Sequence, residues 1–169
     1  MPAFEPANRA CFAASVSDRG DDFFDRFTDR YNALPAEQDA GVCVFHVPVA
    51  EDGSVLGRFN LIDIEDRTAE LGYRVAQRVA GRGVATATVR ELCRPAATRY
   101  GLRTLGAATT RRNAASRKVL TKAGFVAVGP ADPARLGGRP GTWYRRDLAL
   151  QPDGAVLPGD RPRGGEGHR

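Results

Sequence analysis

The chain has 169 residues, of which 42% are hydrophobic and 27% charged, and this is typical of one soluble globular domain. It contains no run of about eighteen apolar residues, which excludes a membrane-spanning helix. The N-terminus has neither a basic start nor an apolar stretch, so no secretory signal is indicated and we expect a cytoplasmic protein.

Cysteine and histidine residues are too few and too scattered to indicate a metal site or a disulfide framework. The three cysteines, Cys11, Cys43 and Cys93, form no CxxC pair, and His46 and His168 are far apart in the sequence. We therefore expect no metal cofactor.

Charge is distributed unevenly along the chain, whose net charge is +5. Residues 1–70 carry 6 Arg and 14 Asp or Glu, a net charge of −8, whereas residues 71–131 carry 12 Arg or Lys and one acid, a net charge of +11. The basic section should attract a polyanion, and the acidic half something cationic. A GC-rich genome can also produce many arginines, but it does not explain why acids are missing from residues 71–131.

The first half of the chain predicts helices followed by antiparallel strands. Residues 8–19 permit a short helix without demanding one, and Asp21 is a typical N-cap for a helix with aromatic side chains along one face. Strands then follow over residues 42–47, 55–64 and 69–75, the first two joined by an Asp-Gly turn. These three strands predict an antiparallel meander.

The second half alternates between helices and strands. Residues 84–100 predict a helix, which Pro95 should kink or split. Further along come a strand over 104–109, a helix over 114–123 capped by Asn113, a strand over 125–128, a loop over 130–140 and a strand over 142–150. We expect residues 1–150 to form one domain with an α+β fold of mixed layers around a central sheet, and residues 151–169 to be a flexible tail.

A glycine-containing loop leads from the third strand into the helix that begins at Val84. Gly81 and Gly83 allow backbone N–H groups to point toward one place, and the helix N-terminus adds partial positive charge. Four arginines and no acid surround the loop: Arg74, Arg78, Arg82 and Arg90. The arrangement indicates a pyrophosphate site, although a simple glycine turn has the same spacing. The GxxxxGK[ST] and GxGxxG patterns are both missing, which disfavours a P-loop hydrolase and a dinucleotide-binding fold.

Four segments recur here in the order and spacing of a known family: residues 69–75 (AELGYRV), 81–86 (GRGVAT), 113–120 (NAASRKVL) and 123–125 (AGF). They resemble the GNAT superfamily of acyl-CoA-dependent N-acetyltransferases, and within it the branch that contains the ribosomal-protein-alanine N-acetyltransferases. With flanking strands, the resemblance covers roughly residues 40–150. It implies a mostly antiparallel, twisted sheet flanked by helices and splayed between strands 69–75 and 104–109, with acetyl-CoA as co-substrate.

The resemblance also implies roles for individual residues. Backbone atoms of Tyr73, Arg74 and Val75 would pair with the pantetheine arm, and Asn113 and Ser116 would face the cofactor from the following helix. The pyrophosphate would lie against the loop and the first helical turn, which comprise Gly81, Arg82, Gly83, Val84, Ala85 and Thr86. The sequence departs from the family at Ala80, where the loop pattern has Gln or Arg. Because such a loop binds phosphate chiefly through backbone N–H groups, we expect cofactor binding to survive in weaker form, with Gln77 or Arg78 able to compensate.

The implied reaction is direct attack of an amine on the thioester within a ternary complex. Such a reaction needs a base for the amine, a donor for the oxyanion, and a proton or hydrogen bond for the departing thiolate. Glu70 is the candidate base and Ser116 the candidate thiolate partner. The alternatives are a solvated strand glutamate and a serine that only caps its helix.

The sequence is compatible with three classes of function to different degrees. We favour an N-acetyltransferase whose acceptor is a protein N-terminus or a small amine, steered by the acidic half. The alternative is a non-catalytic acyl-CoA-binding module, which Ala80 favours and Glu70 and Ser116 oppose. A nucleic-acid-binding protein is disfavoured because the basic section has only three aromatic residues and no recognition motif. Membrane binding is not indicated, and a homodimer is compatible with such folds.

Overall fold

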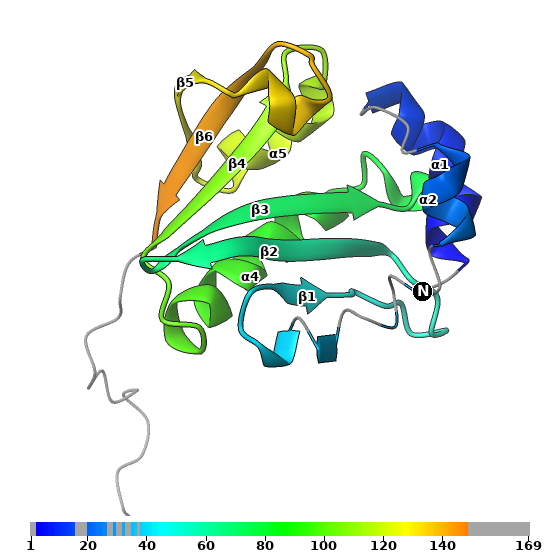
Figure 1. Cartoon of the computed structure of the whole chain (residues 1–169), viewed down its shortest axis with the longest axis horizontal. Helices are drawn as coiled ribbons and strands as arrows, with labels where there is room; N and C mark the ends of the chain where they lie inside the picture. Colours follow the sequence, from blue (N-terminus) through cyan, green and yellow to red (C-terminus); the bar gives the residue numbers. More distant parts are fainter. Residues whose placement is uncertain are drawn as a thin grey trace, which may run out of the picture.

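The computed structural model describes residues 3–15, 20–26, 29, 32, 35, 36 and 38–148. Within them the chain forms one sheet with helices packed around it (Figure 1). The elements in order are α1 (Phe4–Ser15), α2 (Asp21–Asp25), β1 (Val44–His46), β2 (Gly57–Glu65), β3 (Thr68–Val75), η1 (Gln77–Val79), α4 (Val84–Thr98), β4 (Thr104–Thr110), α5 (Ala114–Lys122), β5 (Val126–Pro130), η2 (Pro133–Leu136) and β6 (Gly141–Asp147). None of the described helices is long and apolar enough to cross a bilayer.

The sheet has six strands in the order β1-β2-β3-β4-β6-β5, and every neighbouring pair is antiparallel except β3 with β4. These two parallel strands pair only from Thr68–Thr104 to Glu70–Gly106. Beyond that point they separate, so in Figure 1 they leave one end of the molecule together and open like a V. The predicted mixed α/β fold and the predicted splay between strands 69–75 and 104–109 are therefore confirmed.

One face of the sheet carries the hydrophobic core. Strand side chains alternate between the two faces, and Phe59 and Leu61 of β2, both 0% exposed, lie on the face that α4 covers. They pack in one cluster with Leu71 of β3 and with Val89 and Leu92 of α4. The opposite face of β2 and β3 therefore presents the intervening residues, which are mostly polar.

Several predicted boundaries are corrected by the structure. The helix α4 is not split at Pro95, because this proline lies within one turn of the C-terminal end, where the Pro95 carbonyl still accepts from Arg99 N at 2.9 Å. The short helix that residues 8–19 permit is part of α1, which starts earlier, at Phe4, and extends to Ser15; residues 16–19 lie outside the described residues. The 130–140 loop contains the short helix η2, and β6 ends at Asp147. The aromatic face predicted for the helix after Asp21 falls largely outside the described residues from residue 27 on. The predicted tail, residues 151–169, also lies outside them.

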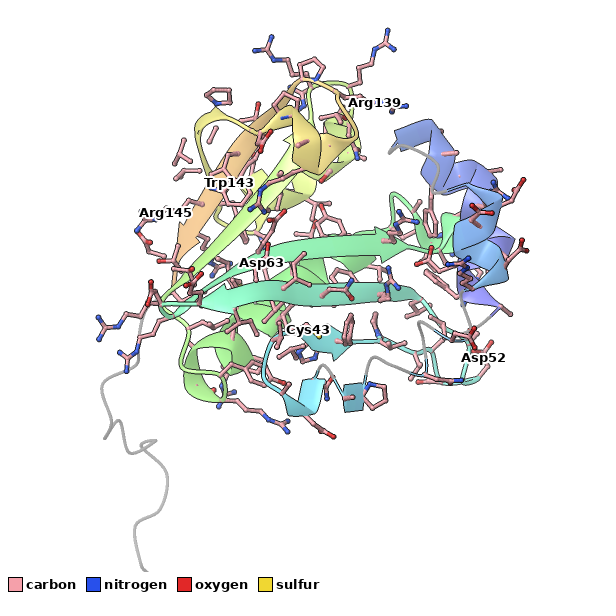
Figure 2. All side chains as sticks on the ribbon, in the orientation of Figure 1. Cys43, Asp52, Asp63, Arg139, Trp143 and Arg145 are labelled. Atoms are coloured by element: carbon pink, nitrogen blue, oxygen red, sulfur yellow. The ribbon has the colours of Figure 1, made fainter. Side chains whose placement is uncertain are left out.

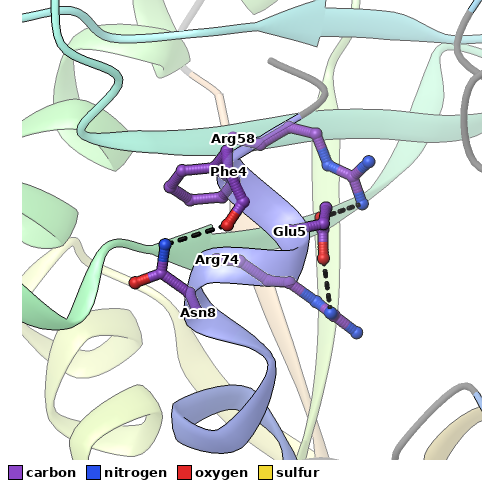
Figure 3. A network of polar contacts seen from close by, with 5 residues as sticks. All are labelled: Phe4, Glu5, Asn8, Arg58 and Arg74. Atoms are coloured by element: carbon purple, nitrogen blue, oxygen red, sulfur yellow. Dashed lines mark hydrogen bonds and ion pairs between the residues drawn. The ribbon is translucent and has the colours of Figure 1, made fainter. Parts of the chain in front are cut away.

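A buried carboxylate attaches α1 to the sheet. Glu5 is 0% exposed and lies between two arginines that face each other across β2 and β3: Arg74 Nη1 is 2.9 Å from Glu5 Oε2, and Arg58 Nη2 is 3.1 Å from Glu5 Oε1 (Figure 3). The same helix contacts the loop after β3, because Gln77 N donates to Asn8 Oδ1 at 2.9 Å. The N-terminal helix is thus held over the end of β3 where the sheet opens.

We predict that Glu5→Gln lowers the free energy of unfolding by about 3 kcal/mol, because a neutral amide leaves two buried guanidinium groups without a counter-charge. Chemical denaturation of the two proteins measures the difference. The control is Glu51→Gln, which removes an exposed carboxylate and should change stability by less than about 0.5 kcal/mol. Equal stability of Glu5→Gln and the wild type would show that the ion pairs do not hold α1.

Candidate active site

Two cavities meet where β3 and β4 separate. The first, which we call the loop cavity, has a volume of about 600 Å³ and lies between the end of β3, residues 79–86 and the helix α5. The second, the sheet cavity, has a volume of about 370 Å³ and is lined by β2, β3, β4 and the η2 segment. Four residues line both cavities: Tyr73, Arg74, Asn113 and Ser116. The splay therefore connects one side of the sheet to the other.

The loop cavity has the features of an anion site. Gly81 and Gly83 have φ angles of +75° and +81°, a backbone conformation that disfavours side chains. Gly83 is the N-cap of α4 and provides no side-chain cap, so the first N–H groups of this helix remain available to a ligand. Lys118 and Lys122 add positive charge from α5, and the lining includes no carboxylate.

Ten of the predicted cofactor-binding residues line this cavity, namely Tyr73, Arg74, Val75, Gly81, Gly83, Val84, Ala85, Thr86, Asn113 and Ser116. Arg82 does not line it, and its side chain is exposed. Neither residue that could compensate for Ala80 lines the cavity: Arg78 donates to Ser54 Oγ at 2.7 Å, and Gln77 lies outside the lining. Ala80 itself is part of the cavity wall.

A hydrogen-bonded pair lies at the junction of the two cavities. The hydroxyl of Tyr73 is 2.9 Å from Ser116 Oγ, and the Tyr73 ring stacks on Phe59 with centroids 5.4 Å apart. Ser116 also occupies the first turn of α5, where its backbone N–H donates to Asn113 Oδ1 at 3.0 Å. The predicted N-cap is thus confirmed, and it uses the backbone of Ser116 while the side-chain hydroxyl contacts Tyr73.

The environment of Tyr73 keeps its hydroxyl protonated. Burial raises the pKa of Tyr73 to about 12, and the hydrogen bond with Ser116 opposes this only in part. At neutral pH the phenol is therefore an O–H donor. The sequence analysis gave Tyr73 only a backbone role, because nothing local indicates that its hydroxyl meets a residue 43 positions away.

Glu70 lies in the sheet cavity and not in the loop cavity. Its side chain is 15% exposed and forms an ion pair with Arg135 of η2. Arg135 also approaches Asp63 at 3.5 Å and lies over the ring of Trp143 at 5.6 Å; Figure 2 labels these two neighbours. Sequence reasoning missed Arg135, because it belongs to a segment expected to be a plain loop.

The described residues contain no group of three or more His, Cys, Asp or Glu side chains arranged to hold a metal ion. The polar groups that line the two cavities are hydroxyls, guanidinium and ammonium groups, side-chain and backbone amides and one carboxylate. Such a set can bind anions, donate hydrogen bonds and accept a proton.

We predict that Tyr73 ionises about two pH units later than a free tyrosine, whose pKa is near 10. Tyrosinate absorbs near 295 nm. At pH 11 the native wild type and the native Tyr73→Phe variant should have the same absorbance there, because Tyr73 is still neutral. When both proteins are unfolded at that pH, the wild type should gain the absorbance of one tyrosinate more than the variant gains. The stability that neutral Tyr73 contributes is complete below pH 10 and is lost as the pH rises toward 12. If the native wild type had one tyrosinate more than native Tyr73→Phe at pH 11, the buried environment assigned to Tyr73 would be wrong.

Comparisons with known proteins agree with this geometry. A family model described as an acetyltransferase (GNAT) domain matches residues 9–126. Among solved structures, a ribosomal-protein-S5-alanine acetyltransferase from Vibrio fischeri aligns with a TM-score of 0.80 and 20% identity, over 90% of this chain and 88% of that one.

Two further structures were determined with CoA species. RimJ from Mycobacterium smegmatis, in complex with CoA-disulfide, aligns with a TM-score of 0.78 and 23% identity, over 90% of this chain and 78% of that one. A spermidine N-acetyltransferase from Vibrio cholerae, in complex with CoA and spermine, aligns with a TM-score of 0.65 and 19% identity, over 75% and 76% of the two chains. A comparison with curated proteins found no match. Because the family model covers more than half of the sequence and the fold agrees, the chain belongs to the GNAT family of acetyl-CoA-dependent N-acetyltransferases.

Proposed function

We propose that the protein transfers the acetyl group of acetyl-CoA to a primary amine, on a protein N-terminus or a small molecule, by direct attack within a ternary complex. The observation that carries the proposal is the meeting of two cavities at Tyr73 and Ser116. One cavity has the backbone geometry for a pyrophosphate, and the other opens on the opposite face of the sheet. Two substrates can thus enter from different sides and meet at one point.

The loop cavity would hold the cofactor. Pairing between β3 and β4 ends at Glu70, so the backbone groups of residues 71–75 on that edge are free to bind the amides of the pantetheine arm. The N–H groups from Gly81 to Thr86 would bind the pyrophosphate, with Lys118 and Lys122 nearby. In this arrangement the thioester lies beside Tyr73 and Ser116.

The sheet cavity would hold the acceptor. The amine nitrogen attacks the thioester carbonyl carbon, the C–S bond then breaks, and the products are the N-acetyl amide and the CoA thiol. Ser116 would donate a hydrogen bond to the departing sulfur while it accepts one from the protonated Tyr73 hydroxyl. The sulfur would take the proton of Ser116, Ser116 that of Tyr73, and Tyr73 would be reprotonated from solvent, to which Glu70 releases the proton lost by the amine.

Glu70 remains the proposed base for the amine. It is the one carboxylate among the residues that line the sheet cavity, and it comes from the strand that also provides Tyr73. Its ion pair with Arg135 keeps it in place. It would accept the proton that the ammonium group must lose before attack, directly or through one water molecule.

We predict that Glu70→Gln lowers kcat at neutral pH by at least about 100-fold while the affinity for CoA is unchanged, because general-base catalysis is lost and the loop cavity is not altered. Steady-state acetyl transfer and calorimetric titration with CoA measure the two quantities. The matched control is Glu91→Gln, an exposed carboxylate of α4, which should leave both unchanged. A Glu70→Gln enzyme with wild-type kcat would remove Glu70 from the mechanism.

We predict that Gly83→Ala weakens CoA binding about tenfold, because an L residue at a φ of +81° costs roughly 1–2 kcal/mol and disturbs the N–H groups of the loop. Gly53→Ala is the matched control: its φ of +79° imposes the same backbone cost in an exposed turn away from the loop cavity. If both variants bind CoA like the wild type, the loop is not the cofactor site. Tight binding without acetylation of any amine would instead favour the acyl-CoA-binding module.

A further inference from the structure

The floor of the sheet cavity is the face of β2 and β3 that is turned away from the hydrophobic core. Its residues face each other in register: Arg58 lies opposite Arg74, and Asn60 lies opposite Gly72. A Cβ atom added to Gly72 would meet no other atom within 4 Å. The middle of the floor is therefore open, with a pair of guanidinium groups at one end and Glu70 toward the other.

Buried polar atoms without a hydrogen-bond partner gather at this cavity. Among the described residues, five buried side-chain atoms have none, and three of these five belong to its lining: Arg58 Nε, Asn60 Oδ1 and Thr110 Oγ1. A fourth, Oε1 of Glu5, makes no hydrogen bond but is already in the 3.1 Å ion pair with Arg58. Arg58 Nε can only donate, Asn60 Oδ1 can only accept and Thr110 Oγ1 can do either, so the set fits a ligand that has both an acceptor and a donor group.

The charge of the cavity is positive. Its lining contains three guanidinium groups, from Arg58, Arg74 and Arg135, against the single carboxylate of Glu70. Adding Glu5, which pairs with both Arg58 and Arg74, leaves three positive charges against two negative ones. The acidic N-terminal half, expected to steer a cation, contributes a single acid, Glu70, to the lining itself, together with Arg58.

The guanidinium of Arg58 is buried, and its Nε–H has no hydrogen-bond partner. The residue is 8% exposed, and it shares one carboxylate with Arg74. Burial lowers the pKa of Arg58, Glu5 opposes this, and the like charge of Arg74 adds to it. A second anion at this end of the cavity would accept the free Nε–H and neutralise the excess charge.

These features favour one kind of acceptor over another. A polyamine has only N–H donors and several positive charges, so it would leave Arg58 Nε unsatisfied and meet a net positive surface. An amine that also carries a carboxylate can place its anion at Arg58 and Arg74. Its nitrogen can then lie across Gly72, toward the junction formed by Tyr73 and Ser116.

We propose that the acceptor is a primary amine that bears a carboxylate, bound in the sheet cavity with the carboxylate at Arg58 and Arg74. The proposal rests on the N-acetyltransferase function described above. The carboxylate can be the α-carboxylate of a free amino acid or an acidic side chain close to a peptide N-terminus. Both sources present the same chemistry to the two arginines.

The test compares acetyl transfer to two near-isosteric pairs of acceptors that differ in charge, and to two cationic acceptors. The peptide amides Ala-Asp-Ala, Ala-Asn-Ala and Ala-Lys-Ala test an acidic side chain, alanine against alaninamide tests the α-carboxylate, and spermidine represents the polyamines. The carboxylate-bearing member of at least one pair should have a kcat/KM at least tenfold above its neutral partner, mainly through KM. Spermidine and the lysine peptide should be the poorest acceptors. A preference for either of these two, or no difference within both pairs, would overturn the proposal.

An isosteric variant tests whether the preference arises in the sheet cavity. Asn60→Asp adds a carboxylate between the arginine pair and Glu70 without changing the side-chain size, and it should reduce the preference for the acidic acceptor about tenfold. The matched control is Asn32→Asp, which adds the same charge at an exposed position and should retain the wild-type preference. An unchanged affinity for CoA shows that Asn60→Asp is folded. An unchanged preference in that folded variant would refute the assignment of the carboxylate to this cavity.

Failure of the proposal and failure of the underlying function give different results. If acetyl-CoA binds but none of these amines, nor a broad amine panel, is acetylated, the N-acetyltransferase function is wrong and the inference falls with it. If spermidine or the neutral acceptors are acetylated as well as the acidic ones, the function stands and only the inference is refuted.

Discussion

Strands β3 and β4 pair in parallel over three residue pairs and then diverge, and both cavities exist because of that divergence. Continued pairing would satisfy the backbone of residues 71–75 within the sheet and close the passage between its two faces. The antiparallel pairs on either side, β2 with β3 and β4 with β6, keep each half of the sheet intact. The sheet can therefore open in the middle without losing its core, which lies on the face covered by α4.

The open end of the sheet is held by charge as well as by apolar contact. Glu5 connects α1 to β2 and β3 through Arg58 and Arg74, and Phe12 of the same helix lies against the Arg74 guanidinium at 4.9 Å. One carboxylate does not neutralise two guanidinium groups. The arrangement that holds α1 in place thus also leaves positive charge in the sheet cavity, so the stability of the N-terminal helix and the proposed selectivity for acidic acceptors depend on the same three side chains.

The junction of the cavities combines a rigid support with a polar pair. The ring of Tyr73 stacks on Phe59, which is fully buried, and its hydroxyl meets Ser116 at the first turn of α5. Because the Asn113 cap bonds to the backbone of Ser116, the capping role and the proposed catalytic role of this segment do not compete. A protonated phenol beside a serine hydroxyl provides a donor where the departing sulfur would lie.

Local patterns in the sequence determined the elements and the glycine loop, because alternation, N-caps and paired glycines act over a few residues: β3, α4, α5 and the Asn113 cap appear where they were expected. The order of these motifs was also enough to indicate the family. The tertiary structure alone decided which side chains meet. Glu5 and Arg74 are 69 positions apart, Glu70 and Arg135 are 65 apart, and Tyr73 and Ser116 are 43 apart. No local pattern encodes such contacts, since they follow from the register of the strands and from where the parallel pairing stops. The charge of the sheet cavity shows most clearly how local pattern and tertiary structure differ. The acidic half of the sequence predicted a site for cations, whereas the fold places three arginines in this cavity.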